Sequence, residues 1–191
     1  HTEVRRQRQM CIRDRVKMKR IICILLSGIL MSGCEQNENG GGAPNSRQTT
    51  VNDTLPKVTG IGGIFFKSKN PKEISAWYGK NLGLAIDDYG SPFEFRNANN
   101  PDEVNYLRWS PHPESTEYFA PSEKAFMINY RVQNIEGLVR NLIANGVTIV
   151  DSIVEYEYGK FVHIMDPEGN KIELWEPVDS ELTKMTGETT K

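Results

Sequence analysis

The feature that most constrains the fold is a pattern of strand and helix signals that occurs twice in the same order. In the first copy, an apolar strand from Gly60 to Phe66 runs into Asn70-Pro71-Lys72-Glu73. Here Asn caps a helix, Pro occupies its first turn and Glu completes a capping box. In the second copy, a strand from Phe126 to Val132 leads to a cap at Asn134 and to apolar residues at helical spacing. The repetition predicts two modules of the same kind.

Three short strands are expected after each helix, and a glycine, Gly83 or Gly146, ends each helix. The closing strands share a signature, because Trp109-Ser110-Pro111 and Trp175-Glu176-Pro177 lie about 66 residues apart. We therefore predict an α+β fold of two tandem β-α-β-β-β modules. The expected strands are 84–88, 92–96 and 104–110 in the first module, and 147–155, 160–165 and 171–176 in the second.

Composition supports one domain with tails. The chain has 191 residues, of which 38% are hydrophobic and 25% are charged, so we expect a single domain over 58–177. Its modules span 58–111 and 125–177, and residues 178–191 are expected to form a flexible tail. A net charge of -2 argues against a nucleic-acid partner. All three cysteines precede the domain, which excludes a thiolate metal site or a catalytic cysteine within it.

The N-terminal segment has the order of an export signal. From Met18 the chain continues with basic residues, an apolar run and Ser32-Gly33-Cys34. This resembles a bacterial lipoprotein signal over 18–33, which implies lipid on Cys34 and a polar tether over 34–57. We expect residues 1–17 to be upstream, non-native translation. The expected location is the bacterial cell envelope, with the domain outside the cytoplasm and the lipid as a membrane anchor.

The closing segment, from His163 through Asp166-Pro167-Glu168-Gly169-Asn170 to Pro177, resembles the vicinal oxygen chelate superfamily. This superfamily includes glyoxalase I, extradiol dioxygenases, fosfomycin-resistance enzymes and bleomycin-resistance proteins. The segment from Gly60 to Lys69 is similar to the first module of the same family. The resemblance implies that the two modules curl a mixed sheet into a concave ligand cup with the helices outside. It also makes a homodimer possible, since some members exchange modules between chains.

The same resemblance implies four metal-ligand positions, which correspond here to Gly63, Leu107, Met127 and Glu173. Glu173 alone has a side chain suited to a hard metal ion. We therefore expect no cofactor. A Zn²⁺, Ni²⁺ or Fe²⁺ ion would need a relocated site that uses Glu173 with His163 and Asn129, or a ligand from a second subunit.

Strand alternation predicts which side chains line the cup. Without metal ligands, the inner face still offers aromatic rings and polar anchors that suit a small planar or cationic organic molecule. Arg131 could anchor a carboxylate or phosphate, or could reach solvent instead. The two tryptophans could instead be core residues. The expected ligand-binding residues are Phe65, Lys67, Trp109, Asn129, Arg131, His163 and Trp175.

Two other functions remain open at this point. His163 and Glu173 could act as an acid-base pair in a glyoxalase-like lyase, isomerase or dioxygenase, or could simply be a buried hydrogen-bonded pair. The domain could instead contact another envelope protein through the loop from Glu114 to Phe119. His112 lies in the long loop expected from Pro111 to Lys124, which could border the cup as a lid or simply join the modules.

Overall fold

The computed structural model describes residues 55–98 and 100–191. The expected signal at 18–33, the lipidation residue Cys34, the upstream segment 1–17 and most of the tether lie outside the described residues. Within the described part of the chain, none of the helices has the length and apolar character needed to cross a membrane.

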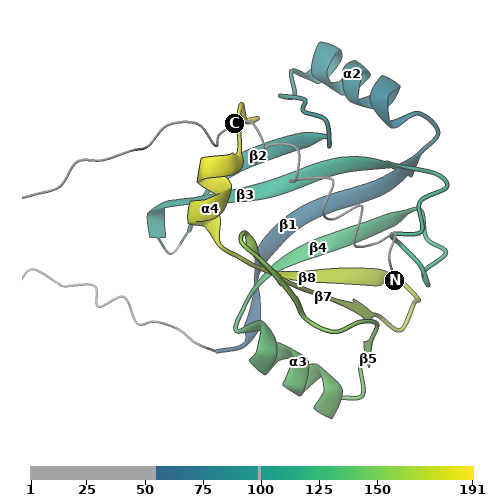
Figure 1. Ribbon diagram of the computed structural model, residues 1–191, viewed down its shortest axis with the longest axis vertical. Helices are drawn as coiled ribbons and strands as arrows, with labels where there is room; N and C mark the ends of the chain where they lie inside the picture. Colours follow the sequence, from purple (N-terminus) through teal and green to yellow (C-terminus); the bar gives the residue numbers. More distant parts are fainter. Residues whose placement is uncertain (1–54, 99) are drawn as a thin grey trace, which may run out of the picture.

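The elements follow the chain in two similar groups (Figure 1). The first module holds β1 (Lys57–Ser68), α2 (Pro71–Leu82), β2 (Ser91–Asn97) and β3 (Asn100–Pro113). The second module holds β4 (Phe126–Gln133), α3 (Ile135–Ala144), β5 (Thr148–Ile149), β6 (Val154–Tyr156), β7 (Gly159–Met165) and β8 (Lys171–Pro177). A short helix, α4 (Asp179–Met185), follows.

One mixed sheet unites the modules. Within the described residues it has eight strands in the order β2-β3-β1-β4-β8-β7-β5, with β6 paired to β7. The first strands of the two modules, β1 and β4, meet in antiparallel pairing at the centre. Each then pairs in parallel with the closing strand of its own module, β1 with β3 and β4 with β8. The expected α+β fold with a doubled module is confirmed.

Local signals explain where the helices begin and end. The Asn70 side chain accepts a hydrogen bond from the Glu73 backbone N–H at 3.2 Å, and the Asn134 side chain caps α3 in the same way through the Gly137 N–H at 3.0 Å. Gly83 ends α2 with a positive φ of 73°, a conformation that costs glycine little. Both caps and the glycine stop of α2 were readable from the sequence.

Three expectations about elements were wrong. Residues 84–88 form only an isolated bridge between Asp87 and Gly90, and the strand expected over 147–155 is split into β5 and β6. The tail at 178–191 folds back onto the domain instead of extending from it. After α4, Thr190 pairs with Phe93, and its backbone N–H donates to the Pro92 carbonyl at 2.8 Å.

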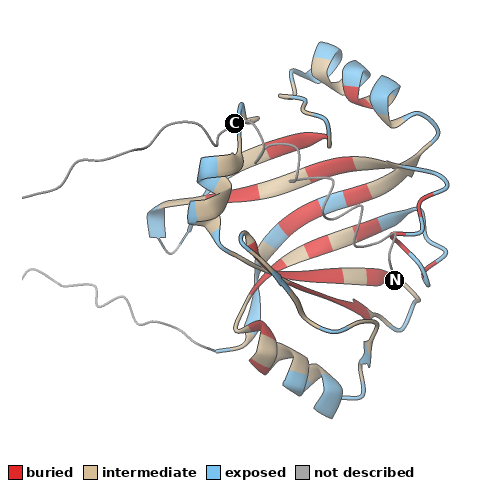
Figure 2. Ribbon diagram, viewed as in Figure 1, coloured by how far each residue is buried: buried red, intermediate tan, exposed pale blue. Residues whose placement is uncertain are grey.

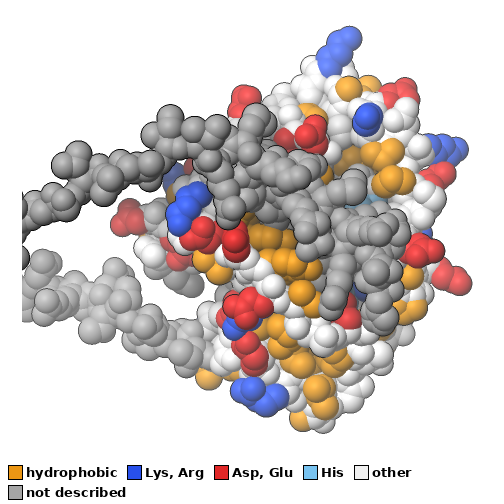
Figure 3. Space-filling view, viewed as in Figure 1, with side chains coloured by type: hydrophobic (Ala, Val, Ile, Leu, Met, Phe, Trp, Pro, Cys, Tyr) orange, Lys and Arg blue, Asp and Glu red, His pale blue; other side chains and the backbone are white. Residues whose placement is uncertain are grey.

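The two faces of the sheet differ in what covers them. Helices α2 and α3 pack on one face, where Tyr78 of α2 contacts Trp109 and where Ile135 of α3 joins Leu174 in the core. We call the opposite side the inner face. Buried segments run along the central strands in Figure 2, whereas α2 and α4 remain largely exposed or half-buried. In the space-filling view, acidic and basic side chains are interspersed along the visible rim (Figure 3).

Candidate functional site

The inner face is lined by polar and charged side chains that are almost fully buried. Strand alternation places them there, since residues two apart along β4, β7 and β8 share a face. His163 pairs in register with Glu173, and Glu173 pairs with Asn129, so three neighbouring strands bring these side chains together. The structure thus groups most of the expected pocket residues. The buried inner-face residues of these strands are Met127, Asn129, Arg131, Phe161, His163, Lys171, Glu173 and Trp175.

Glu173 is the centre of a hydrogen-bond network. The Asn129 amide donates to Glu173 Oε2 at 2.7 Å, and the Tyr118 hydroxyl donates to Oε1. His163 Nε2 lies 3.0 Å from the same Oε1. Only 2% of the Glu173 residue is exposed. A carboxylate so far from water is stabilised only because several donors satisfy it.

His163 lies between two carboxylates. Its Nδ1 is 2.7 Å from Asp151 Oδ2, its backbone N–H donates to Asp151 Oδ1 at 2.8 Å, and its Nε2 faces Glu173. Each ring nitrogen of His163 therefore lies within hydrogen-bond distance of one carboxylate oxygen. Asp151 orients the ring as the third member of a carboxylate, imidazole and carboxylate chain, which is an arrangement that could also pass a proton.

The loop between the modules closes this end of the inner face. Tyr118 and Phe119 are buried, and Lys171 Nζ donates to the Tyr118 carbonyl at 2.8 Å. His112 stacks on Tyr118 with ring centroids 5.5 Å apart. Burial lowers the pKa of His112 to about 4, an effect that the Glu173 carboxylate only partly offsets. The loop from Glu114 to Phe119 was expected to be available to a protein partner. Much of its length is instead packed against the domain.

A second buried charge lies nearer to α4. The Arg131 guanidinium donates to Asp179 Oδ2 at 2.5 Å and to the Tyr106 carbonyl at 3.1 Å. It also lies over the Trp175 ring, with 5.2 Å to the ring centroid. Arg131 does not reach solvent, since its side chain is only 5% exposed. The segment expected to be a flexible tail thus supplies the counter-charge of an inner-face arginine.

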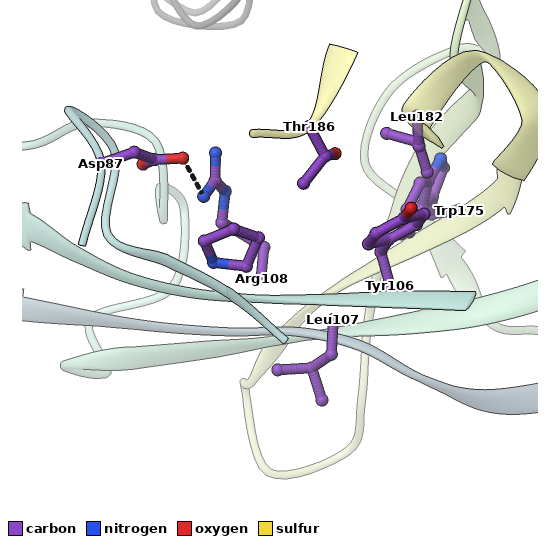
Figure 4. Close-up of a pocket in the computed structure, with 8 residues that line it drawn as sticks. Asp87, Tyr106, Leu107, Arg108, Trp175, Leu182 and Thr186 are labelled. Carbon is purple, nitrogen blue, oxygen red and sulfur yellow. Dashed lines mark hydrogen bonds and ion pairs between the residues drawn. The ribbon is translucent and has the colours of Figure 1, made fainter. Parts of the chain in front are cut away.

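A pocket of about 90 Å³ opens between the inner face and α4 (Figure 4). Trp175 and Tyr106 form an aromatic wall, and Arg108 points into the pocket, where its NH1 contacts Asp87 Oδ2 at 2.7 Å. Two residues of the C-terminal segment, Leu182 and Thr186, also line the pocket, together with Pro92 and Leu107 of the first module. The pocket combines aromatic surface with a guanidinium and a carboxylate, which is a common composition for a site that orients a small polar molecule.

Two expected positions lie elsewhere. Trp109 was expected in the pocket, but it packs on the opposite face against Tyr78 and Phe66, at 4.6 and 5.2 Å between ring centroids. Leu107 was expected on the inner face, but its side chain points away from the pocket in Figure 4. The reason is a shift of one residue: Gly63 pairs with Arg108, so Arg108 faces the inner side and its neighbours Leu107 and Trp109 face the other side.

The residues at the four family positions do not fit a metal ion. Gly63 offers no ligand and lies against the Phe65 ring, while Met127 is buried in an apolar cluster with Phe65 and Tyr118. At the third position, the Leu107 side chain offers no ligand and points away from the pocket (Figure 4), and the neighbouring Arg108 brings positive charge. Among residues 55–98 and 100–191, no group of three or more His, Cys, Asp or Glu side chains is arranged to hold a metal.

The remaining expected residues border the site. Phe65 contacts His112 at 5.7 Å between ring centroids, and Lys67 Nζ lies 5.8 Å from the Phe119 ring centroid. The sequence reasoning missed the other residues of the site. Among these, loops or the tail carry Tyr118, Asp151 and Asp179, and the shifted register hid Arg108. Of these four residues, only Arg108 could have been found from the sequence, since it is one residue from Leu107, the expected ligand position.

The family model described as Glyoxalase/Bleomycin resistance protein/Dioxygenase superfamily matches residues 60–174. No curated protein matches the chain. Among solved structures, methylmalonyl-CoA epimerase from Mycobacterium tuberculosis is similar at 19% identity and a TM-score of 0.44, with 66% of this chain and 93% of that chain covered.

Two further solved structures are similar to this chain. A catechol 2,3-dioxygenase matches at 17% identity and a TM-score of 0.45, with 64% of this chain and 40% of that chain covered. A glyoxalase/bleomycin resistance protein/dioxygenase superfamily member from Vibrio splendidus 12B01 matches at 12% identity and a TM-score of 0.39, with 61% of this chain and 97% of that chain covered.

Proposed function

We propose that this chain, which belongs to the Glyoxalase/Bleomycin resistance protein/Dioxygenase superfamily, binds a small organic molecule on the inner face of its sheet. The observation that carries the proposal is the pocket beneath α4. Trp175 and Tyr106 offer ring surface there, and the ion pair of Arg108 with Asp87 offers donors and an acceptor. Aromatic stacking combined with a few directed polar groups favours a small planar molecule.

Tryptophan fluorescence tests this proposal directly, because the three tryptophans occupy different places. Trp175 lines the pocket, Trp109 lies on the opposite face and Trp77 is exposed on α2. A Trp77→Phe, Trp109→Phe chain leaves Trp175 as the reporter. A Trp77→Phe, Trp175→Phe chain leaves Trp109 and is the matched control. Each would be titrated with a panel of small aromatic and carbonyl metabolites.

We expect saturable quenching of Trp175 by at least one compound, with no matching change at Trp109. The Arg108→Gln variant should weaken that binding, since it removes the cation of the pocket but leaves its aromatic wall. An absence of saturable quenching across the panel, or an equal response at both tryptophans, would count against a ligand pocket at this place.

We also propose that the domain is tethered to a membrane by lipid on Cys34. Support comes from the order of the N-terminal sequence, which is basic, then apolar, then Ser32-Gly33-Cys34. In a bacterial host, Cys34→Ser should move the protein from the membrane fraction to the soluble fraction, and Cys23→Ser is the control. Persistence of the Cys34→Ser protein in membranes would contradict the lipid anchor.

Acid-base catalysis is a second candidate function. It is favoured by one observation, the chain from Asp151 through His163 to Glu173, which holds the imidazole in a fixed orientation. His163 is fully buried, so a substrate would reach it only if Tyr118 moved away. The test is exchange of C–H protons next to a carbonyl in D₂O, followed by NMR over a panel of oxo acids and thioesters. Exchange lost in His163→Gln supports catalysis, and exchange equal to that of the buffer contradicts it.

A further inference from the structure

Arg131 has the surroundings of a carboxylate receptor. Its guanidinium lies between the rings of Trp175 and Phe95, at 5.2 and 5.8 Å from their centroids, and it is buried in the inner face. NH1 is used by the Tyr106 carbonyl, and NH2 donates to Asp179. A planar guanidinium held by stacking is well suited to bind a carboxylate, because its donors are already oriented.

The Asp179 carboxylate, which Arg131 holds, has only part of its hydrogen bonding satisfied. Both the Arg131 NH2 and the Asn105 amide donate to Asp179 Oδ2, at 2.5 and 3.2 Å. Asp179 Oδ1 is buried, and it has no hydrogen-bond partner among the described residues. Burial raises the pKa of Asp179, although the bond and charge of Arg131 oppose that rise. A buried carboxylate oxygen without a donor is costly, so this ion pair is weaker than its short distance suggests.

The helix that carries Asp179 buries little of its own surface. Helix α4 has seven residues, none of them buried, and its N-terminus has no side-chain cap. A further polar contact of α4 with the sheet comes from Tyr106, whose hydroxyl donates to Thr183 Oγ1 at 3.1 Å. Isolated helices of this length are marginal in water, so moving α4 gives up little intrinsic stability.

Arg131 and the pocket are adjacent. Trp175 and Tyr106 line the pocket and also contact Arg131, while Leu182 and Thr186 of the C-terminal segment cover it. A molecule with a ring in the pocket could therefore place an anionic group at Arg131 only by taking the position of Asp179.

We propose that Asp179 occupies the place of a ligand carboxylate, and that the site takes a small aromatic carboxylate. The ring lies against Trp175 and Tyr106, and the carboxylate replaces Asp179 on Arg131 as α4 moves aside. This inference rests on the proposed function and adds to it the class of ligand and the residue that competes with it.

The test uses benzoate as the probe and benzamide as its neutral counterpart. Both are titrated into the chain that has Trp175 as its reporter, with and without Asp179→Asn. We expect Asp179→Asn to bind benzoate at least tenfold more tightly than the parent, because the internal competitor has lost its charge. Benzamide binding should change much less. Glu181→Gln is the matched control: it removes a half-buried carboxylate from the same helix, and benzoate affinity should stay at the parent value.

Adding Arg131→Gln to Asp179→Asn should abolish the preference for benzoate over benzamide. Thr183→Ala tests the same idea without altering any charge, since it loosens α4 and should raise benzoate affinity by a smaller factor. The inference fails if folded Asp179→Asn, judged by circular dichroism, binds benzoate no better than the parent, or if both probes gain equally. Failure of the proposed function looks different: neither benzoate nor benzamide, nor any other small molecule, would bind to any variant.

Discussion

At the scale of single residues, Tyr118 shows how much the inner face depends on one hydroxyl. That hydroxyl donates to Glu173, whose carboxylate is almost fully buried. Tyr118→Phe keeps the ring stacked on His112 and removes only this donor. We expect a loss of about 1.5–3 kcal/mol in the free energy of unfolding, the usual range for a hydrogen bond to a charged group. Urea denaturation measures it.

Tyr156→Phe is the matched control. Tyr156 is the last residue of β6, and its ring stacks on Tyr158 and not on the residues around Glu173. Its effect should stay within about 0.5 kcal/mol, as is usual for substitutions outside the core. If both tyrosine variants lost the same stability, the Glu173 network would not be the cause.

His112 gives the domain a dependence on pH whose sign can be worked out. Burial lowers the pKa of His112 from 6.5 to about 4, so the folded state favours the neutral ring. The unfolded chain therefore binds more protons between pH 6.5 and 4, and the stability of the fold falls as the pH drops through this window. A shift of this size corresponds to roughly 3 kcal/mol by pH 4.

The measurement is the difference in unfolding free energy between pH 7 and pH 4.5, compared in the parent and in His112→Phe. The variant keeps an aromatic ring against Tyr118 but cannot take up a proton. It should lose less stability on acidification than the parent does. Identical losses in the two proteins would show that other groups, and not His112, are responsible.

The period of the strands was enough to predict much of the candidate site. Alternation along β7 and β8 placed His163, Glu173 and Trp175 on one face, because neighbouring side chains in a strand point to opposite sides. It could not place Tyr118 or Asp179, which reach the site from a loop and from the tail. Their positions depend on tertiary packing, for which no local pattern exists.

At the scale of elements, the bulge in β1 decides what the inner face can hold. The register between β1 and β4 shifts between Ile61 and Gly63. A Cβ on Gly62 would lie 2.2 Å from Asn129 Oδ1 and 2.7 Å from the Trp175 ring. Gly62→Ala should cost about 1–3 kcal/mol through overpacking. It should also weaken any ligand held by Trp175.

Gly60→Ala is the matched control in the same strand. The nearest atom to its Cβ would be Arg131 Cδ at 3.8 Å, an ordinary contact. Replacing a strand glycine without a clash should leave stability unchanged or slightly higher, since the unfolded chain loses freedom. Thermal melting of the two variants distinguishes a local clash at Gly62 from a general intolerance of β1.

Elements with strong local signals were predicted well, and weak ones were not. The caps at Asn70 and Asn134 fixed both long helices. The shared Trp-X-Pro signature gave the repeat but misplaced its register by one residue, because the two tryptophans pack on opposite faces. Trp109 fills space beneath α2, whereas Trp175 covers Arg131. The similar sequences around the two tryptophans therefore gave no sign that the two rings pack against different residues.

At the scale of the whole molecule, the two modules are bound through their central strands and through side chains that cross between them. Strands β1 and β4 pair from Lys57 opposite Gln133 to Phe66 opposite Phe126. Arg131 of the second module donates to the Tyr106 carbonyl of the first at 3.1 Å. Neither half buries its inner face alone.

We therefore expect the modules to unfold together, although each has its own helix and closing strand. In the chain that has Trp175 as its reporter, fluorescence follows the second module, while far-UV circular dichroism follows both. The two signals should give the same urea midpoint and slope, as in a two-state transition. The chain that reports through Trp109 gives the reciprocal measurement on the first module. In either chain, a fluorescence transition at a different urea concentration from the circular dichroism transition would show that the modules unfold as independent units. Arg131 would then contribute to ligand binding but would not couple the unfolding of the two modules.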